Sequence, residues 1–170
     1  VVALVGQLGS GKTTFLEKLV AEMNSRGFRL GVIKHHRGSF DIDRPGKDTW
    51  RLARAGAACT AIAGPGRIGM VMRVDGDPDP GAVADLMPGV DLVITEGYKK
   101  GPFPQIEVRR AGCGNGRPAC RARQLAAVVG YRVLGEEKVP CFHPEDVAGV
   151  ADFIEREFLQ AGKKDGPGED

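Results

Sequence analysis

A glycine-rich loop between an apolar run and a helical pattern constrains this chain more than any other feature. Residues 1–5 form a continuous apolar run, which is typical of a strand buried on both faces. Residues 6–13 read Gly-Gln-Leu-Gly-Ser-Gly-Lys-Thr and satisfy G-x-x-x-x-G-K-[ST]. From 12 to 26 apolar residues recur at helical spacing, and Gly27 follows where a helix C-cap glycine belongs. The order strand, loop, helix predicts a phosphate-binding loop.

Each part of this loop has a physical reason to hold an anion. Glycines allow successive backbone N–H groups to point toward one centre, and the N-terminus of the following helix adds a partial positive charge. We expect Lys12 to reach the β- and γ-phosphates of a nucleotide and the Thr13 hydroxyl to ligate Mg²⁺. The candidate nucleotide-binding residues are Gly6, Gln7, Leu8, Gly9, Ser10, Gly11, Lys12, Thr13 and Thr14.

Two acidic residues are candidates for the metal. Glu96 ends the apolar run "DLVITE", so it is predicted at the strand end beside the loop, where it would ligate Mg²⁺ or its water. Asp48 follows an irregular segment, residues 35–48, and could meet the Mg²⁺ shell or position water. The alternatives are an unrelated salt bridge for Glu96 and a helix N-cap for Asp48. The candidate metal ligands are therefore Thr13, Glu96 and Asp48, and the candidate catalytic residues are Lys12 and Asp48.

The rest of the chain alternates strand-like and helix-like segments. This order indicates an α/β fold with a mostly parallel sheet. Gly64-Pro65-Gly66 between two apolar runs predicts an antiparallel hairpin attached to that sheet, with Cys59 in the core. We expect one domain over residues 1–162 and a disordered tail over 163–170. Further strands are predicted within 28–34, 90–97, 105–110, 125–130 and 139–142, and helices within 49–57, 77–89 and 144–162.

Charge and hydropathy limit the partners that can be inferred. A formal net charge of +2 implies neither nucleic-acid binding nor attraction to a membrane surface. No segment approaches the roughly 18 consecutive apolar residues of a membrane span. The first apolar run passes straight into glycines, so it is interpreted as a strand and not as a signal peptide. We expect a cytoplasmic protein whose four cysteines are reduced.

Several segments together resemble a known family. They are "GQLGSGKTTFLEKL", "VIKHH", "DIDRPGKDTWRLARAGA" and "DLVITEGYKKGPFPQIEVRR", which lie between residue 1 and about residue 110. The chain resembles the molybdopterin-guanine dinucleotide biosynthesis adapter family, MobB. The resemblance implies a three-layer P-loop NTPase fold, a homodimer, GTP and Mg²⁺ as ligands, and weak GTPase activity. It also implies assistance to a MobA-type molybdenum cofactor guanylyltransferase, with molybdopterin or molybdoenzymes as further candidate partners.

The resemblance assigns roles to the matching motifs. Residues 9–14 would hold the nucleotide phosphates, "IKHH" and "GKDTW" would form a switch-like loop near the γ-phosphate, and "EGYKK" would lie beside the site. The chain has no [NT]-K-x-D motif, which reads guanine in many related GTPases. Gly130 and Tyr131 also stand where similar proteins tend to carry a polar or acidic residue. The choice between GTP and ATP is therefore left open by the residues themselves.

Two other classes of function stay open on the sequence. A small-molecule kinase would close a basic lid over the phosphates, and the arginines of residues 109–123 could form one. They are Arg109, Arg110, Arg117, Arg121 and Arg123. A metallochaperone would bind zinc through Cys113, Cys120, Cys141 and His143, although the C-x6-C spacing is wider than the usual spacing of zinc ligands.

Overall fold

The computed structural model describes residues 1–113, 117–133 and 135–160, in two compact units. The first unit comprises residues 1–35 and the described residues from 80 onward, and the second comprises residues 36–79. The expectation of a single domain over 1–162 stays a prediction, and the predicted tail, 163–170, lies outside the described residues.

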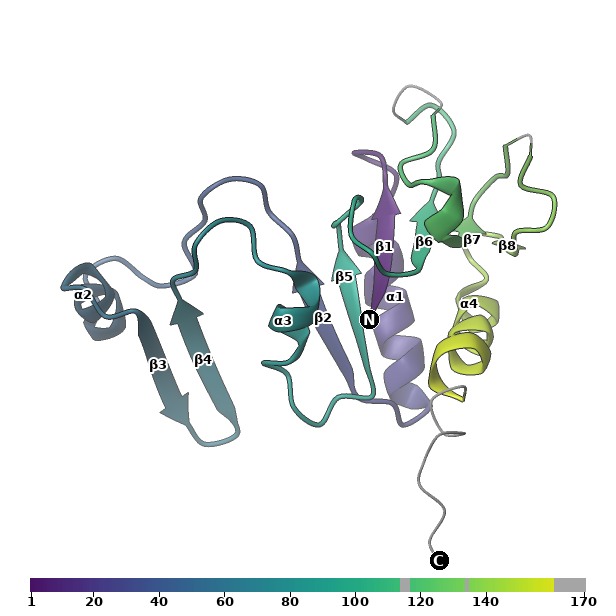
Figure 1. Ribbon diagram of the computed structural model, residues 1–170. Helices are drawn as coiled ribbons and strands as arrows, with labels where there is room; N and C mark the ends of the chain where they lie inside the picture. The colour runs from purple at the N-terminus through teal and green to yellow at the C-terminus, as the bar shows by residue number, and fades with distance from the viewer. Residues whose placement is uncertain (114–116, 134, 161–170) are drawn as a thin grey trace, which may run out of the picture. The chain divides into compact units, whose positions relative to one another are not determined.

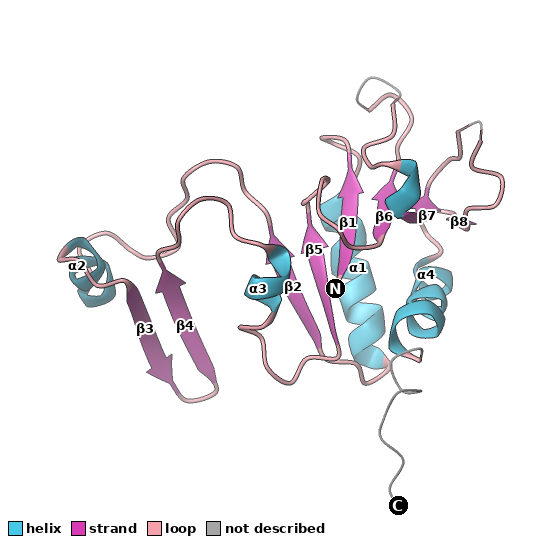
Figure 2. Ribbon diagram, viewed as in Figure 1, coloured by secondary structure: helices cyan, strands magenta, loops and turns pink. Residues whose placement is uncertain are grey.

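A six-stranded sheet forms the centre of the first unit (Figures 1 and 2). Its strand order is β2-β5-β1-β6-β7-β8, and every neighbouring pair is parallel. The expected α/β fold with a mostly parallel sheet is therefore confirmed. The strands are β1 Val2–Gly6, β2 Leu30–Lys34, β5 Leu92–Glu96, β6 Gln105–Val108, β7 Leu125–Val129 and β8 Cys141–Phe142.

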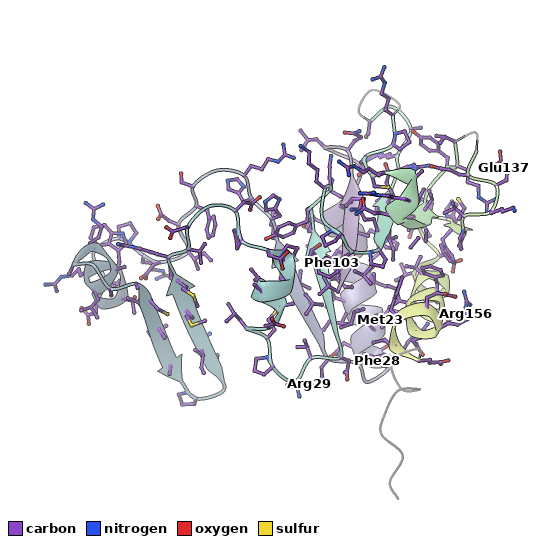
Figure 3. All side chains as sticks on the ribbon, viewed as in Figure 1. Met23, Phe28, Arg29, Phe103, Glu137 and Arg156 are labelled. Carbon is purple, nitrogen blue, oxygen red and sulfur yellow. The ribbon has the colours of Figure 1, made fainter. Side chains whose placement is uncertain are left out.

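Two helices cover one face of this sheet. Helix α1, Lys12–Ser25, and helix α4, Val147–Ile154, pack against each other and against the apolar side chains of the strands. Met23 of α1 is fully buried in this core, and its position is labelled in Figure 3. Helix α1 ends where expected, because Gly27 takes the left-handed conformation (φ 87°) that helix C-termini favour.

The last helix begins later than predicted and changes type along its length. It begins at Val147 and not near Pro144, because the Asp146 carboxylate caps it by accepting from the Gly149 N–H at 3.0 Å. The α-helix ends at Ile154 and continues as a π-helical segment, Glu155–Leu159. The predicted residues 161 and 162 lie outside the described residues.

The opposite face of the sheet carries buried polar side chains, and loops contact them. Glu107 accepts from the Ala119 N–H at 2.6 Å, and Gln105 donates to the Lys99 carbonyl at 3.2 Å. Near the edge strand β2, the short helix α3, Pro80–Ala84, leads to a turn that contacts Gly31. A 3₁₀ helix, Ala122–Gln124, precedes β7.

The second unit contains the predicted hairpin as a separate two-stranded sheet. Strands β3, Cys59–Gly64, and β4, Arg67–Met72, pair antiparallel around a Pro65-Gly66 turn. The short helix α2, Asp48–Arg54, precedes them. Cys59 is exposed, so its predicted core position is wrong, because a lone hairpin has no second layer of its own to cover both faces. No helix in the described parts of the chain is long and apolar enough to cross a membrane.

Candidate nucleotide-binding site

The loop between β1 and α1 has the backbone conformation that the sequence motif requires. Gly6, Gly9 and Gly11 all have positive φ angles, of 155°, 77° and 88°. A Cβ on Gly6 would lie 2.4 Å from the Val108 carbonyl oxygen and 2.7 Å from Ser10 Oγ, so only glycine fits there. At Gly11 a Cβ would meet nothing within 4 Å, and the left-handed φ angle alone favours glycine. The loop therefore curls tightly at its start and opens toward α1.

A buried hydroxyl inside the loop has its hydrogen-bonding capacity unused. Ser10 is 5% exposed, and its Oγ has no hydrogen-bond partner among the described residues. A buried polar atom without a partner is costly, and such atoms at a site often await a ligand or water. Ser10 therefore supports an interpretation of the loop as a binding element and not as a plain turn.

Lys12 crosses the mouth of the loop. Its Nζ donates to the Gln7 carbonyl at 2.8 Å, so the ammonium group lies over the curl of backbone. Burial lowers the pKa of Lys12, and the nearby Glu96 carboxylate opposes this effect. The charge of Lys99 also lowers the pKa of Lys12. The placement of "EGYKK" beside a nucleotide site stays a prediction. A partly desolvated ammonium group gains most from an anionic ligand.

Thr13 and Glu96 meet beside Lys12. The Thr13 hydroxyl donates to Glu96 Oε1 at 3.0 Å. Glu96 reaches this position because β1 and β5 are parallel neighbours, with Leu4 opposite Glu96, so both strands end at the same edge. Asp91 lies at the other end of β5, where its carboxylate accepts from the Arg29 N–H at 2.7 Å. A hydroxyl and a carboxylate are hard oxygen donors, so this pair fits Mg²⁺.

Asp48 and the second histidine of "IKHH" belong to the second unit. Asp48 is the first residue of α2, and its carboxylate lies 3.9 Å from Arg51. Lys47 occupies the N-cap, so Asp48 is not the capping residue. The catalytic and metal roles of Asp48 stay predictions. In the first unit, the His35 ring stacks on Tyr98 with centroids 4.1 Å apart, next to Glu96.

A cavity of about 530 Å³ adjoins the glycine loop between β1 and α1. The loop and α1 line one side with Ser10, Thr14 and Lys18, and the segments after β6, β7 and β8 line the other. Those segments bring Arg110, Tyr131, His143 and Glu145. No sequence motif predicts a role in nucleotide binding for Lys18, His143 or Glu145. The place of His143 and Glu145 after a predicted strand was the one sequence signal for such a role: polar residues follow the carboxyl end of "VPCF", residues 139–142.

A buried ion-pair network fixes two segments that line this cavity. Arg109 donates to Glu107 Oε2 and to Glu136 Oε1, each at 2.8 Å. The Arg109 guanidinium holds the pKa of Glu136 below its usual value. Burial, reinforced by the Glu107 carboxylate, raises the pKa of the Cys120 thiol to about 12. Arg109 is therefore committed to structure, which removes it from the basic lid that a kinase would need.

The predicted zinc ligands are engaged separately. The Cys113 thiol donates to the Gly9 carbonyl at 3.4 Å, Cys120 to Glu107 at 3.4 Å, and Cys141 to the Gly130 carbonyl at 3.6 Å. Within the part of the chain that the structure describes, no three His, Cys, Asp or Glu side chains gather as a metal site. The arrangement gives the metallochaperone hypothesis no support.

The chain is similar in sequence and structure to proteins of one known family. The sequence profile of the family described as MobB, molybdopterin guanine dinucleotide synthesis protein B, matches residues 1–131. The molybdopterin-guanine dinucleotide biosynthesis adapter protein of Escherichia coli K12 is 35% identical over 90% of this chain and 90% of its own. The Haemophilus influenzae protein of the same name is 32% identical over 91% and 86%. The crystal structure of Bacillus subtilis MobB superposes with a TM-score of 0.67, at 27% identity over 89% and 96%.

Proposed function

This chain belongs to the MobB family, and from that premise we propose that it is a GTP-binding adapter protein with weak GTPase activity in molybdopterin-guanine dinucleotide biosynthesis. The adapter role follows from the names of its relatives. The nucleotide-binding role is supported by one observation above all. Thr13 and Glu96 meet at 3.0 Å beside Lys12, at the open end of a glycine loop.

The phosphates would bind where the loop concentrates hydrogen-bond donors. Backbone N–H groups of residues 9–14 and the Lys12 ammonium group would donate hydrogen bonds to the triphosphate, and the N-terminus of α1 adds its dipole. Thr13 and Glu96 would hold Mg²⁺ together with water and phosphate oxygens, as Mg²⁺ prefers. The metal would supply positive charge against the β- and γ-phosphates. The metal role of Asp48 stays a prediction from the sequence.

Slow hydrolysis is expected from the same contacts. Glu96 is the carboxylate whose charge acts on Lys12, and it already accepts from Thr13. A carboxylate committed to the metal shell cannot also orient an attacking water efficiently. Faster turnover would need a further group, which a partner protein could supply.

The second unit supports the proposal of a homodimer. Its hairpin exposes apolar side chains on both strands, and an isolated two-stranded hairpin is marginally stable in water. A second copy of this chain would remove that surface from water. The exposed apolar residues are Ile62, Ile68, Met70, Val71 and Met72. Light scattering should give the mass of a dimer, and Ile68→Asp should shift the mass toward a monomer, whereas Lys138→Asp should not.

The proposed partner outside the dimer is a MobA-type molybdenum cofactor guanylyltransferase, with molybdopterin or molybdoenzymes as further candidates. An adapter that binds GTP would work beside an enzyme that consumes GTP, so we place it in the cytoplasm. Co-purification of the two proteins with and without GTP tests this partner. If the two proteins do not co-purify either with or without GTP, the proposed partner is wrong.

The nucleotide claim is tested by titration with GTP and ATP side by side. We expect GTP to bind more tightly than ATP, and Lys12→Ala to lose most binding of both, because the loop loses its one side-chain cation. Lys138→Ala, at an exposed position after β7, is the matched control and should bind normally. Equal affinity for GTP and ATP would remove the guanine claim, and normal binding by Lys12→Ala would remove the site.

A further inference from the structure

We propose that His143 and Glu145, in the segment between β8 and α4, read the guanine base in the cavity beside the phosphate loop. This inference rests on the proposed function and adds the residues that select the base. The chain lacks the [NT]-K-x-D aspartate that reads guanine elsewhere, so selection of GTP needs another source.

The cavity has the place and size that a nucleoside needs. Ser10 and Thr14 line it, so it begins at the loop that would hold the phosphates. Its volume of about 530 Å³ falls within the range of ligand pockets, roughly 300–1,000 Å³. His143, Pro144 and Glu145 line the same cavity from the segment that follows β8. A nucleotide whose phosphates lie on the loop can therefore extend its base toward that segment.

His143, which lines the cavity, carries a hydrogen-bond donor. The Glu145 backbone N–H donates to His143 Nδ1 at 3.2 Å, so Nδ1 acts as the acceptor. In a neutral imidazole the other nitrogen then carries the proton. The hydrogen-bond network thus assigns Nε2 of His143 as an N–H donor.

Glu145 presents an acceptor two residues later. Its carboxylate accepts from Lys18 Nζ at 2.8 Å, and this bond lowers the pKa of Glu145. The carboxylate is therefore ionised at neutral pH and accepts hydrogen bonds only. Its two oxygens allow it to keep Lys18 as a partner while accepting from a ligand.

This order of donor and acceptor matches guanine and opposes adenine. Along its pairing edge guanine offers the O6 acceptor and then the N1–H and 2-amino donors, whereas adenine offers the 6-amino donor and then the N1 acceptor. His143 Nε2–H would donate to O6, and the Glu145 carboxylate would accept from N1–H and the 2-amino group. With adenine the His143 donor would face the 6-amino donor, and the Glu145 carboxylate would face the N1 acceptor. Two such mismatches weaken binding more than the loss of one hydrogen bond does.

Tyr131 also lines the cavity. It directly follows Gly130 after β7, lines the same space, and is 40% exposed. An aromatic ring at this position offers a stacking surface for any base, so it would add affinity without selecting guanine. Selection is left to His143 and Glu145.

The test replaces Glu145 by glutamine and measures the binding of GTP, xanthosine triphosphate and ATP. The amide offers one acceptor and one donor, which match the N1–H and the 2-oxo group of xanthine. We expect Glu145→Gln to lose roughly 10- to 100-fold in affinity for GTP, the cost of a hydrogen bond to a charged group, and to gain affinity for xanthosine triphosphate. Binding of ATP should not fall.

The matched control is Glu157→Gln. Glu157 is also an exposed glutamate in an ion pair, with Arg156 at 2.9 Å (Arg156 is labelled in Figure 3), and it does not line the cavity. It should leave all three affinities unchanged. A second variant, His143→Ala, should weaken GTP and spare ATP.

The outcomes separate this inference from the proposed function. If the wild type prefers GTP and Glu145→Gln keeps both that affinity and its discrimination against xanthosine triphosphate, the base reader is wrong and the nucleotide site stands. If the wild type binds neither GTP nor ATP, the proposed function fails and this inference fails with it. A switch toward xanthosine triphosphate in Glu145→Gln alone supports it.

Discussion

Arg109 gives a stability prediction that can be worked through from the structure. Arg109 and Glu107 are almost completely buried, and Glu136 is 9% exposed. The guanidinium satisfies both carboxylates, which in turn accept from the Ala119 and Val133 N–H groups at 2.6 and 3.2 Å. Arg109→Met would leave two buried carboxylates without their cation, and breaking a buried pair in this way costs about 3–5 kcal/mol. For a chain of this size that predicts a fall in Tm of roughly 6–20 °C.

Urea unfolding followed by circular dichroism measures this effect, and Arg26→Met is its matched control. Arg26 likewise pairs with carboxylates, in this case three: those of Glu22, Asp152 and Glu155, at 2.6–2.7 Å. Those groups are more exposed, so we expect a loss of only about 1 kcal/mol. Adding Glu107→Gln and Glu136→Gln to Arg109→Met should restore part of the stability. Equal losses in Arg109→Met and Arg26→Met would refute the reasoning that burial makes the Arg109 network costly to break.

Three further predictions concern the same structure. Arg109 lowers the pKa of Glu136 in the folded chain. The stabilisation that the ionised Glu136 gives to the folded state is therefore fully present above the unfolded pKa, near 4.5, and is lost as the pH falls through the lower folded pKa. The free energy of unfolding, measured from pH 6 to pH 3, should fall less in Arg109→Met than in wild type. Gly6→Ala should abolish nucleotide binding and lower stability, since its Cβ would lie 2.4 Å from the Val108 carbonyl, whereas Gly64→Ala, with open space around its Cβ, should change neither; normal binding by Gly6→Ala would contradict this. At pH 8 iodoacetamide should modify exposed Cys59 much faster than Cys120, whose pKa is about 12, as peptide mass spectrometry would show, and equal rates would contradict the burial of Cys120.

The central strands could be predicted because their side chains are locally distinctive. Residues 1–5 and 92–94 are continuous apolar runs, and Gly64-Pro65-Gly66 marks a turn whatever lies around it. The local sequence does not determine the first residue of the last helix, because Pro144 and Asp146 are both typical of helix starts. The hydrogen bond from the Gly149 N–H to the Asp146 carboxylate decides between them. The exposure of Cys59 depends on what covers a hairpin, which its own residues do not encode.

The approach of Glu96 to the glycine loop could be predicted, and the cavity could not. Thr13 and Glu96 meet because parallel strands end at one edge, a rule that needs only the strand assignment. His143 and Glu145 line the cavity because they follow β8, which is the edge strand beside β7. No sequence pattern predicts that place of β8 in the strand order. The Arg109–Glu136 pair likewise joins residues 27 positions apart across two loops.

The most direct test of the phosphate site is the Mg²⁺ dependence of GTP binding in wild type, Thr13→Ala and Glu96→Gln. If these two side chains hold the metal beside the loop, removing Mg²⁺ with a chelator should weaken GTP binding in wild type and change it little in either variant. The same Mg²⁺ dependence in all three proteins would contradict the site.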